Sequence, residues 1–164
     1  MKYFTHKLYL RFNSADRTVV ARAHEEWETA IENYREHIDQ IASRLTPSVR
    51  KLTKALCLHD AAYLGLGRPK IPGLHHSIAV LATRKSATAF LLVYILAKEP
   101  RFQEAGERWP FSKKNVHWLY DEFDVDSDGN QQHEVLLSNG KSITFQFKDL
   151  QLIKDQVDVN LDVA

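Results

Sequence analysis

The dipeptide His59-Asp60 is a pair of residues whose side chains could act together in catalysis. Neutral imidazole and carboxylate ligate divalent metals, and a bound metal activates water for hydrolysis. A complete site needs further ligands, and the chain offers His24 or His37 before the pair and Asp121 after it. One hypothesis is therefore a metal-dependent hydrolase that uses His59, Asp60 and Asp121.

The same dipeptide is similar to the metal-binding pair of the helical metal-dependent phosphohydrolases. Those enzymes are helical throughout, whereas the residues after position 74 have the pattern of strands. The other interpretation is that His59 and Asp60 lie where a helix gives way to the first strand. There they would satisfy backbone groups and each other.

The segment Asp124-x-Asp126-x-Asp128-Gly129 resembles the first half of a calcium loop. Ca²⁺ prefers several oxygen ligands, which alternate Asp residues before a Gly bend can supply. The twelfth position, where a bidentate Glu belongs, is Val135, and the flanks have strand patterns. The segment is therefore predicted to be a polar turn, and a calcium-stabilised module at Asp124, Asp126 and Asp128 is the alternative.

Asp121 falls on an apolar strand face. Period-2 alternation puts it on one side of the strand predicted over 115–125, with Leu119, Phe123 and Val125. A buried carboxylate must be paired or hydrogen-bonded. We expect its partner to be His59, His133 or an arginine.

Cys57 is the only cysteine, which excludes a disulfide framework and a Cys-rich zinc site. We expect it to be an inert, buried thiol. The chain has no P-loop, no dinucleotide-binding glycine motif and no Gly-x-Ser-x-Gly elbow. No cofactor is expected, although a divalent metal at the sites above is possible.

Two helices are predicted in the first third of the chain. Residues 14–45 have apolar positions at steps of three and four, with Ser14 as the expected N-cap. Thr46 and Pro47 then end this helix and begin a second one that runs to about Leu56. The apolar stripe of the long helix is Val19, Val20, Ala23, Trp27, Ala30, Ile31, Tyr34, Ile38, Ile41 and Leu45.

Strand patterns dominate from Leu58 onward, and residues 67–73 and 99–114 are predicted loops with Gly and Pro. The apolar run Phe90 to Ala97 fits a central strand or a helix. Asn139-Gly140 predicts a hairpin with a type I′ turn, and the last three strands form a meander. The predicted strands are 58–65, 76–83, 87–97, 115–125, 132–138 and 142–153.

These elements predict an α+β fold in a single domain of 164 residues. An N-terminal helical hairpin, about 14–57, packs on a C-terminal antiparallel sheet of about five or six strands, 58–153. Residues 1–12 dock on this body as a short helix or strand. Hydrophobic residues make up 44% and charged residues 26%, which excludes a disordered chain.

The net charge of +1 hides a division along the chain. Residues 44–114 hold 13 Lys or Arg against 4 Asp or Glu, and residues 115–164 hold 3 against 10. A division of this kind suits recognition of a protein partner. The basic residues are spread out, so nucleic acid is not expected as a partner. No apolar run reaches the roughly 18 residues of a membrane helix, so no membrane partner is expected.

Distinctive segments lie along most of the chain. They are Met1-Lys2-Tyr3-Phe4-Thr5 with Leu8-Tyr9, Glu25-Glu26-Trp27, Leu58-His59-Asp60-Ala61, Trp118-Leu119-Tyr120-Asp121-Glu122, His133-Glu134-Val135-Leu136-Leu137-Ser138-Asn139-Gly140 and Phe145-Gln146-Phe147-Lys148-Asp149. In these segments the chain resembles a family of uncharacterised bacterial proteins. The resemblance implies a single domain in the bacterial cytoplasm, and it carries over no activity and no site residue.

The leading hypothesis for function is a non-enzymatic binding or protein-interaction module of the bacterial cytoplasm, either monomer or dimer. It follows from the absence of a recognised catalytic motif and from the charge division. The metal-dependent hydrolase and the calcium-stabilised module are the alternatives. A reducing compartment agrees with the single cysteine, and the N-terminal residues lack the apolar region of a secretory signal.

Overall fold

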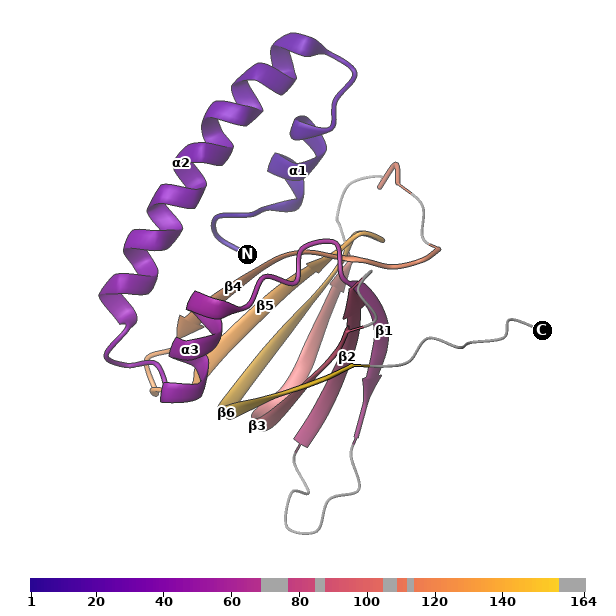
Figure 1. Cartoon of the computed structure of the whole chain (residues 1–164). Coiled ribbons are helices and arrows are strands. Elements are labelled where there is room, and N and C mark those ends of the chain that lie inside the picture. Colours follow the sequence, from indigo (N-terminus) through magenta and orange to yellow (C-terminus); the bar gives the residue numbers. More distant parts are fainter. Residues whose placement is uncertain (69–76, 85–87, 105–108, 112–113, 157–164) are drawn as a thin grey trace, which may run out of the picture.

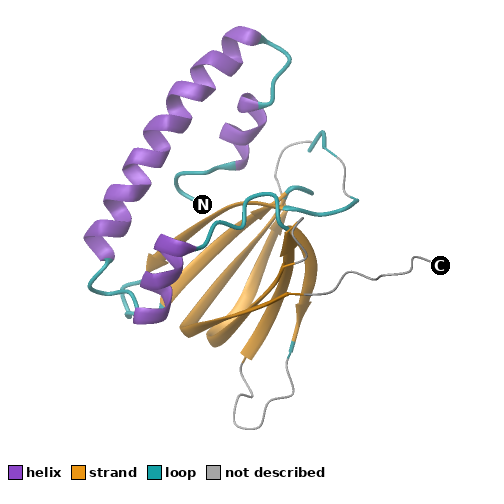
Figure 2. Ribbon diagram, viewed as in Figure 1, coloured by secondary structure: helices purple, strands orange, loops and turns teal. Residues whose placement is uncertain are grey.

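Three helices precede six strands in the structure, a computed structural model that describes residues 1–68, 77–84, 88–104, 109–111 and 114–156 (Figures 1 and 2). The predicted α+β class is confirmed. The helices are α1 (His6–Phe12), α2 (Arg17–Ile41) and α3 (Pro47–Ala55). The strands are β1 (Ala62–Gly67), β2 (Ser77–Arg84), β3 (Thr88–Glu104), β4 (Trp118–Val125), β5 (Gln131–Leu137) and β6 (Lys141–Gln156).

The helix starts follow from capping side chains. The carboxylate of Asp16 accepts a hydrogen bond from Thr18 N (2.8 Å), so Asp16 is the N-cap of α2. The predicted cap, Ser14, is wrong, because its hydroxyl instead accepts from Asp16 N in the turn before the helix. Thr46 caps α3 with Pro47 in its first turn, as predicted.

The strands form one antiparallel sheet in the order β1-β2-β3-β6-β5-β4. The predicted meander is confirmed as β4-β5-β6, and the run Phe90 to Ala97 lies in β3. The predicted loop over 99–114 is wrong for residues 99–104, because β3 continues to Glu104 along β6. Pro100 falls at a register shift between Lys98 and Arg101, where its missing N–H breaks no regular ladder.

The hairpin between β5 and β6 has a different turn from the predicted type I′. Gly140 has φ +81°, and its N–H donates to Leu137 O (3.0 Å). Among the described non-glycine residues only Asp60 and Asn115 have positive φ, so Asn139 does not. A three-residue loop with one left-handed glycine fits these angles. A Cβ on Gly140 would also lie 2.7 Å from the Trp109 ring.

The sheet closes on itself at one end. Ala62 forms an isolated antiparallel bridge with His117. Asp60 N donates to Trp118 O (2.9 Å), and Trp118 N donates to Ala61 O (2.8 Å). Farther along β4, Phe123 N donates to the hydroxyl of Tyr34 on α2 (2.7 Å). A side chain of α2 therefore accepts a hydrogen bond from a backbone amide of β4, beyond the point where residues next to β1 pair with β4.

The buried side chains form two clusters. The larger one lies between the sheet and the α2–α3 turn, and the smaller one joins the N-terminal segment, α1, α2 and β4. Burying each large apolar side chain contributes roughly 1.5–3 kcal/mol. The larger cluster includes Leu45, Val49, Leu52, Tyr94, Phe123, Phe145 and Phe147, and the smaller one includes Phe4, Leu8, Trp27 and, partly buried, Tyr120.

Candidate functional site

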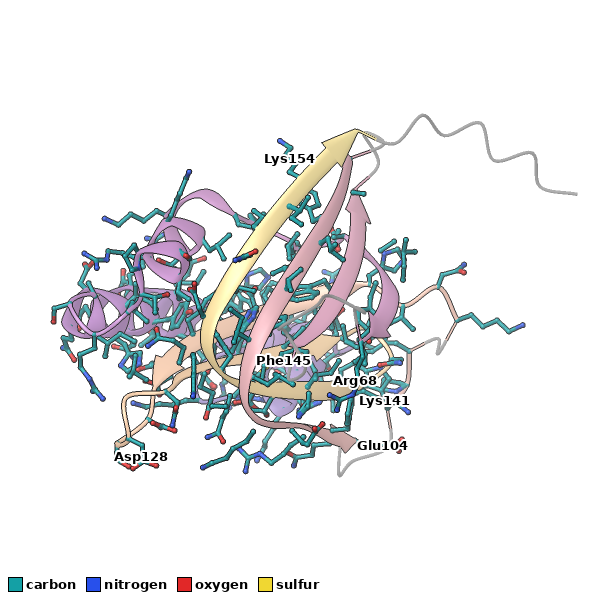
Figure 3. All side chains as sticks on the ribbon, turned by 90° about the horizontal axis from the view of Figure 1, so that it is seen from below. Arg68, Glu104, Asp128, Lys141, Phe145 and Lys154 are labelled. Carbon is teal, nitrogen blue, oxygen red and sulfur yellow. The ribbon has the colours of Figure 1, made fainter. Side chains whose placement is uncertain are left out.

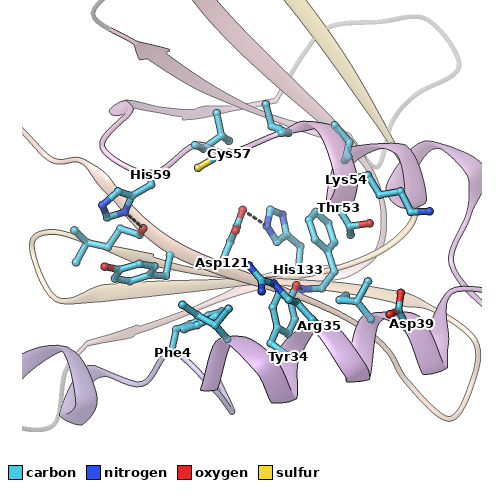
Figure 4. A pocket seen from close by; sticks show the side chains of 18 of the residues that line it. Phe4, Tyr34, Arg35, Asp39, Thr53, Lys54, Cys57, His59, Asp121 and His133 are labelled. Atoms are coloured by element: carbon cyan, nitrogen blue, oxygen red, sulfur yellow. Dashed lines mark hydrogen bonds and ion pairs between the residues drawn. The ribbon is translucent and has the colours of Figure 1, made fainter. Parts of the chain in front are cut away.

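A cavity of about 610 Å³ lies between the two clusters, bounded by α2, the connection from α3 to β1, and β4 (Figure 4). It takes side chains from both clusters, such as Trp27 from the smaller and Phe123 from the larger. Most of its wall is apolar. The apolar and aromatic lining residues are Phe4, Trp27, Ile31, Tyr34, Ile38, Leu52, Leu56, Leu58, Leu119, Tyr120 and Phe123.

The sequence places these side chains by simple periodicities. The α2 residues follow one another at steps of four, three and four, which keeps them on one helix face. On the opposite side, the connection is fixed to β4 because Asp60, at φ +62°, donates its N–H to Trp118 O. The four α2 residues in question are Trp27, Ile31, Tyr34 and Ile38.

A hydrogen-bonded chain of three side chains reaches the floor of the cavity, where Asp121 and His133 line it and the buried Tyr94 does not. Tyr94 Oη lies 2.8 Å from His133 Nδ1, and His133 Nε2 lies 3.0 Å from Asp121 Oδ2. Tyr94 and His133 are fully buried, whereas 33% of the Asp121 side chain is exposed. His133 is thus the partner of Asp121, one of those predicted. Figure 4 shows Asp121 directed into the open space.

The protons of this chain have a consistent arrangement. Burial, with the negative charge of Asp121, raises the pKa of Tyr94 well above its usual value. The phenol therefore keeps its proton at neutral pH, and its hydroxyl shares a hydrogen bond with His133 Nδ1. A carboxylate can only accept, so His133 Nε2 carries a proton and donates to Asp121 Oδ2. The ring of Phe123 stacks on His133 at 3.9 Å and holds the imidazole in place.

His59 lies at the edge of the cavity. Its Nδ1 donates to Leu119 O (2.6 Å), and its ring stacks on Tyr120 at 4.9 Å. Its Nε2 is 3.6 Å from Asp60 Oδ2, beyond hydrogen-bond distance, and the Asp60 side chain is 76% exposed. The predicted hydrogen bond from His59 to a backbone group is present, to Leu119 O. The predicted contact between His59 and Asp60 is longer than a hydrogen bond and lies at the surface.

The residues of the proposed metal-dependent hydrolase have separate partners. His24 packs against the ring of Phe12, and His37 Nε2 lies 3.1 Å from Asp124 Oδ1. Asp121 is bound to His133. Among the residues that the structure describes, no three His, Cys, Asp or Glu side chains form a group that could hold a metal ion. His59 and Asp121 do share the cavity.

The aspartates predicted as possible calcium ligands, in the β4–β5 turn, each have different surroundings. Asp126 Oδ1 accepts from Asp128 N and from Asn130 N, both at 2.9 Å. The hydrogen bond from the Asn130 side chain is the main reason that the pKa of Asp126 is lowered. Asp124 faces His37, and Asp128 lies at the exposed tip (Figure 3). The predicted polar turn is therefore the local structure.

Cys57 lines the cavity and is exposed, so the prediction of a buried thiol is wrong. The reason is that α3 ends at Ala55, and Cys57 belongs to the irregular connection instead of an apolar helix stripe. In Figure 4 it lies across the open space from Asp121. Arg35, Asp39, Thr53 and Lys54 are the remaining polar lining residues.

Sequence reasoning did not identify Tyr94 as part of a site. The signal was present, because alternation along residues 90–96 puts Tyr94 on the buried face with three apolar residues. A buried tyrosine hydroxyl needs a hydrogen-bond partner. The sequence could therefore have indicated a polar group opposite Tyr94, although not that His133 supplies it.

No helix among the described residues is both long and apolar enough to cross a membrane. Comparison of the chain with protein-family models, with curated proteins and with solved structures finds no match in any of the three. The resemblance to a bacterial family therefore stays a prediction, and the cavity itself is the starting point for the function.

Proposed function

We propose that this protein is a non-enzymatic binding module whose ligand is a small molecule held in the cavity between α2, the α3–β1 connection and β4. The observation that carries the proposal is the cavity of about 610 Å³ with a mostly apolar wall and an oriented carboxylate at its floor. Small-molecule sites have this size and composition, with a few polar groups that fix the ligand's orientation.

The His133 imidazole at the floor is not free to act as a base on a ligand. His133 uses both ring nitrogens in hydrogen bonds to Tyr94 and Asp121, so it has no free nitrogen for a substrate. A general base must reach the proton that it abstracts. The imidazole therefore positions the Asp121 carboxylate. We propose the bacterial cytoplasm as the compartment in which the protein binds its ligand.

Titration with a neutral aliphatic alcohol, 1-hexanol, tests the proposal by amide chemical-shift changes in the whole chain. Saturable shifts should appear at residues around the cavity, such as Leu119 and Phe123. Ile31→Trp should fill the space and weaken binding about 10-fold, a loss of about 1.4 kcal/mol. Thr29→Trp is the control, because Thr29 is exposed on the same helix and does not line the cavity.

A fold control accompanies both variants, since each must retain the helical circular dichroism of the parent chain. Equal affinity of the two tryptophan variants for 1-hexanol would contradict the proposed site. Absence of any saturable shift in the parent chain would contradict a small-molecule function.

A further inference from the structure

We propose that the ligand carries a protonated amine and that Asp121 is the residue that binds it. This inference depends on the proposed function, since it names the chemical class of ligand for the same cavity. The observation behind this inference is that one oriented carboxylate and several aromatic rings line the same cavity.

Asp121 lacks a permanent cationic partner among the described residues. Its only ion-pair partner among the described residues is His133, whose imidazole is charged only when it is protonated. Arg35 and Lys54 line the same cavity but form no ion pair with it there. A carboxylate beside apolar walls is costly when unpaired, and a ligand cation offsets that cost.

The carboxylate is held in a fixed orientation. His133 donates to Oδ2 (3.0 Å), and no hydrogen bond within the described part of the chain involves Oδ1. The imidazole cannot turn away easily, because it is fully buried between Tyr94 and the stacked ring of Phe123. Oδ1 is therefore available to accept a hydrogen bond from an N–H group of the ligand.

Four aromatic rings line the same cavity as Asp121. Trp27 and Tyr120 lie 4.4 Å apart by ring centroids, and Phe4 lies 5.2 Å from Trp27 and 5.4 Å from Tyr34. All four residues line the cavity. The faces of such rings attract a cation, and an anion near Asp121 would be repelled. The aromatic rings and the Asp121 carboxylate thus favour a cation, whereas Arg35 and Lys54 elsewhere in the lining do not.

The ligand class that fits is an aliphatic or aromatic ammonium with at least one N–H. Its apolar part would contact Ile31 and Leu58 in the wall, and its ammonium group would contact Asp121. A quaternary ammonium would keep the attraction to the rings but could not donate to Oδ1. That difference separates a carboxylate-bound amine from a purely aromatic cage.

The test uses calorimetric titration of the whole chain at pH 7 with four probes that share a six-carbon chain. They are hexylamine, 1-hexanol, hexanoate and trimethylhexylammonium. Hexylamine should bind about 10-fold more tightly than 1-hexanol, a difference of about 1.4 kcal/mol. The quaternary probe should bind more weakly than hexylamine, and hexanoate should bind weakest.

Asp121→Asn should reduce hexylamine affinity about 10-fold and change 1-hexanol affinity much less. Asp128→Asn is the matched control, because Asp128 is exposed in the β4–β5 turn and does not line the cavity, and it should retain the preference. If Asp121→Asn does not fold, the salt dependence of the parent chain replaces it: hexylamine affinity should fall with added NaCl, while 1-hexanol affinity should not.

The outcomes separate the inference from the function on which it rests. Binding of 1-hexanol with no preference for hexylamine would overturn the amine and leave the binding module standing. Equal binding of hexylamine and the quaternary probe would overturn the role of Asp121 as acceptor. Failure of all four probes to bind would contradict the proposed function itself.

Discussion

Glu122 joins the N-terminal segment to β4 at the scale of single residues. Its carboxylate accepts hydrogen bonds from three successive backbone amides, those of Lys2, Tyr3 and Phe4, at 2.7, 2.8 and 2.7 Å. The residue is only 7% exposed. Three donors on one carboxylate offset the loss of its hydration, and they position Phe4 in the wall of the cavity.

Glu122→Gln should therefore destabilise the folded protein by about 1–3 kcal/mol, because the amide has one acceptor oxygen and leaves buried donors unpaired. Urea unfolding followed by circular dichroism measures this change. Glu32→Gln, on the exposed side of α2, is the control and should shift the free energy of unfolding by less than about 0.5 kcal/mol. Equal midpoints for the two variants would show that the three hydrogen bonds contribute nothing.

Sequence patterns foresaw some of these residues and not others. Strand alternation was enough to place Asp121 on a buried face and to require a partner for it. The role of Glu122 was not predictable, because its three donors lie about 120 positions away in the chain. Cys57 was misplaced for a related reason: its exposure depends on where α3 stops, and helix ends are poorly defined by periodicity.

At the scale of elements, the side chain of Gln131 hydrogen-bonds the α2–α3 turn to the start of β5. Its Oε1 accepts from Thr46 N, and its Nε2 donates to Arg44 O, both at 3.2 Å. The residue is 2% exposed. The two helices of the hairpin are therefore held at a fixed position on the sheet, and α2 and α3 both contribute residues to the cavity wall.

Gln131→Leu should cost about 1–3 kcal/mol, since it leaves a backbone donor and a backbone acceptor without their partner. Gln132→Leu is a matched control, because its side chain belongs to the other face of β5 and is not fully buried. Thermal unfolding of the two variants gives the comparison. A smaller loss for Gln131→Leu than for Gln132→Leu would contradict this role.

The elements themselves were largely predictable, whereas their arrangement was not. Apolar spacing of three and four predicted α2, and the Thr46-Pro47 pair predicted the start of α3, because both depend on neighbours in sequence. The closure of the sheet through Ala62 and His117 was not visible, since it pairs segments that are far apart along the chain. The cavity follows from that closure, so it was missed as well.

The cavity is a property of the whole molecule, because three distant parts of the chain enclose it. Residues from the N-terminal segment, from α2 and α3, and from β4 and β5 contribute to its lining. A tyrosine in an apolar wall is more stable as the neutral phenol than as the charged phenolate, because burial disfavours the charged form. Burial raises the pKa of Tyr120 to about 12, and it raises the pKa of Tyr34 even farther.

These shifts predict that the folded protein loses stability in alkali. Because the folded pKa of Tyr120 lies above the unfolded value near 10, folding favours the protonated phenol. That contribution is complete below pH 10 and disappears as the pH rises through about 12. Tyr120→Phe removes one of these groups, so its free energy of unfolding should fall less between pH 9 and pH 11.5 than that of the parent chain. Urea unfolding across this range measures both slopes, with pH 8 as the internal reference. Identical slopes would mean that Tyr120 ionises in the folded protein as readily as in the unfolded chain, and that the aromatic wall is more open to water than its packing indicates.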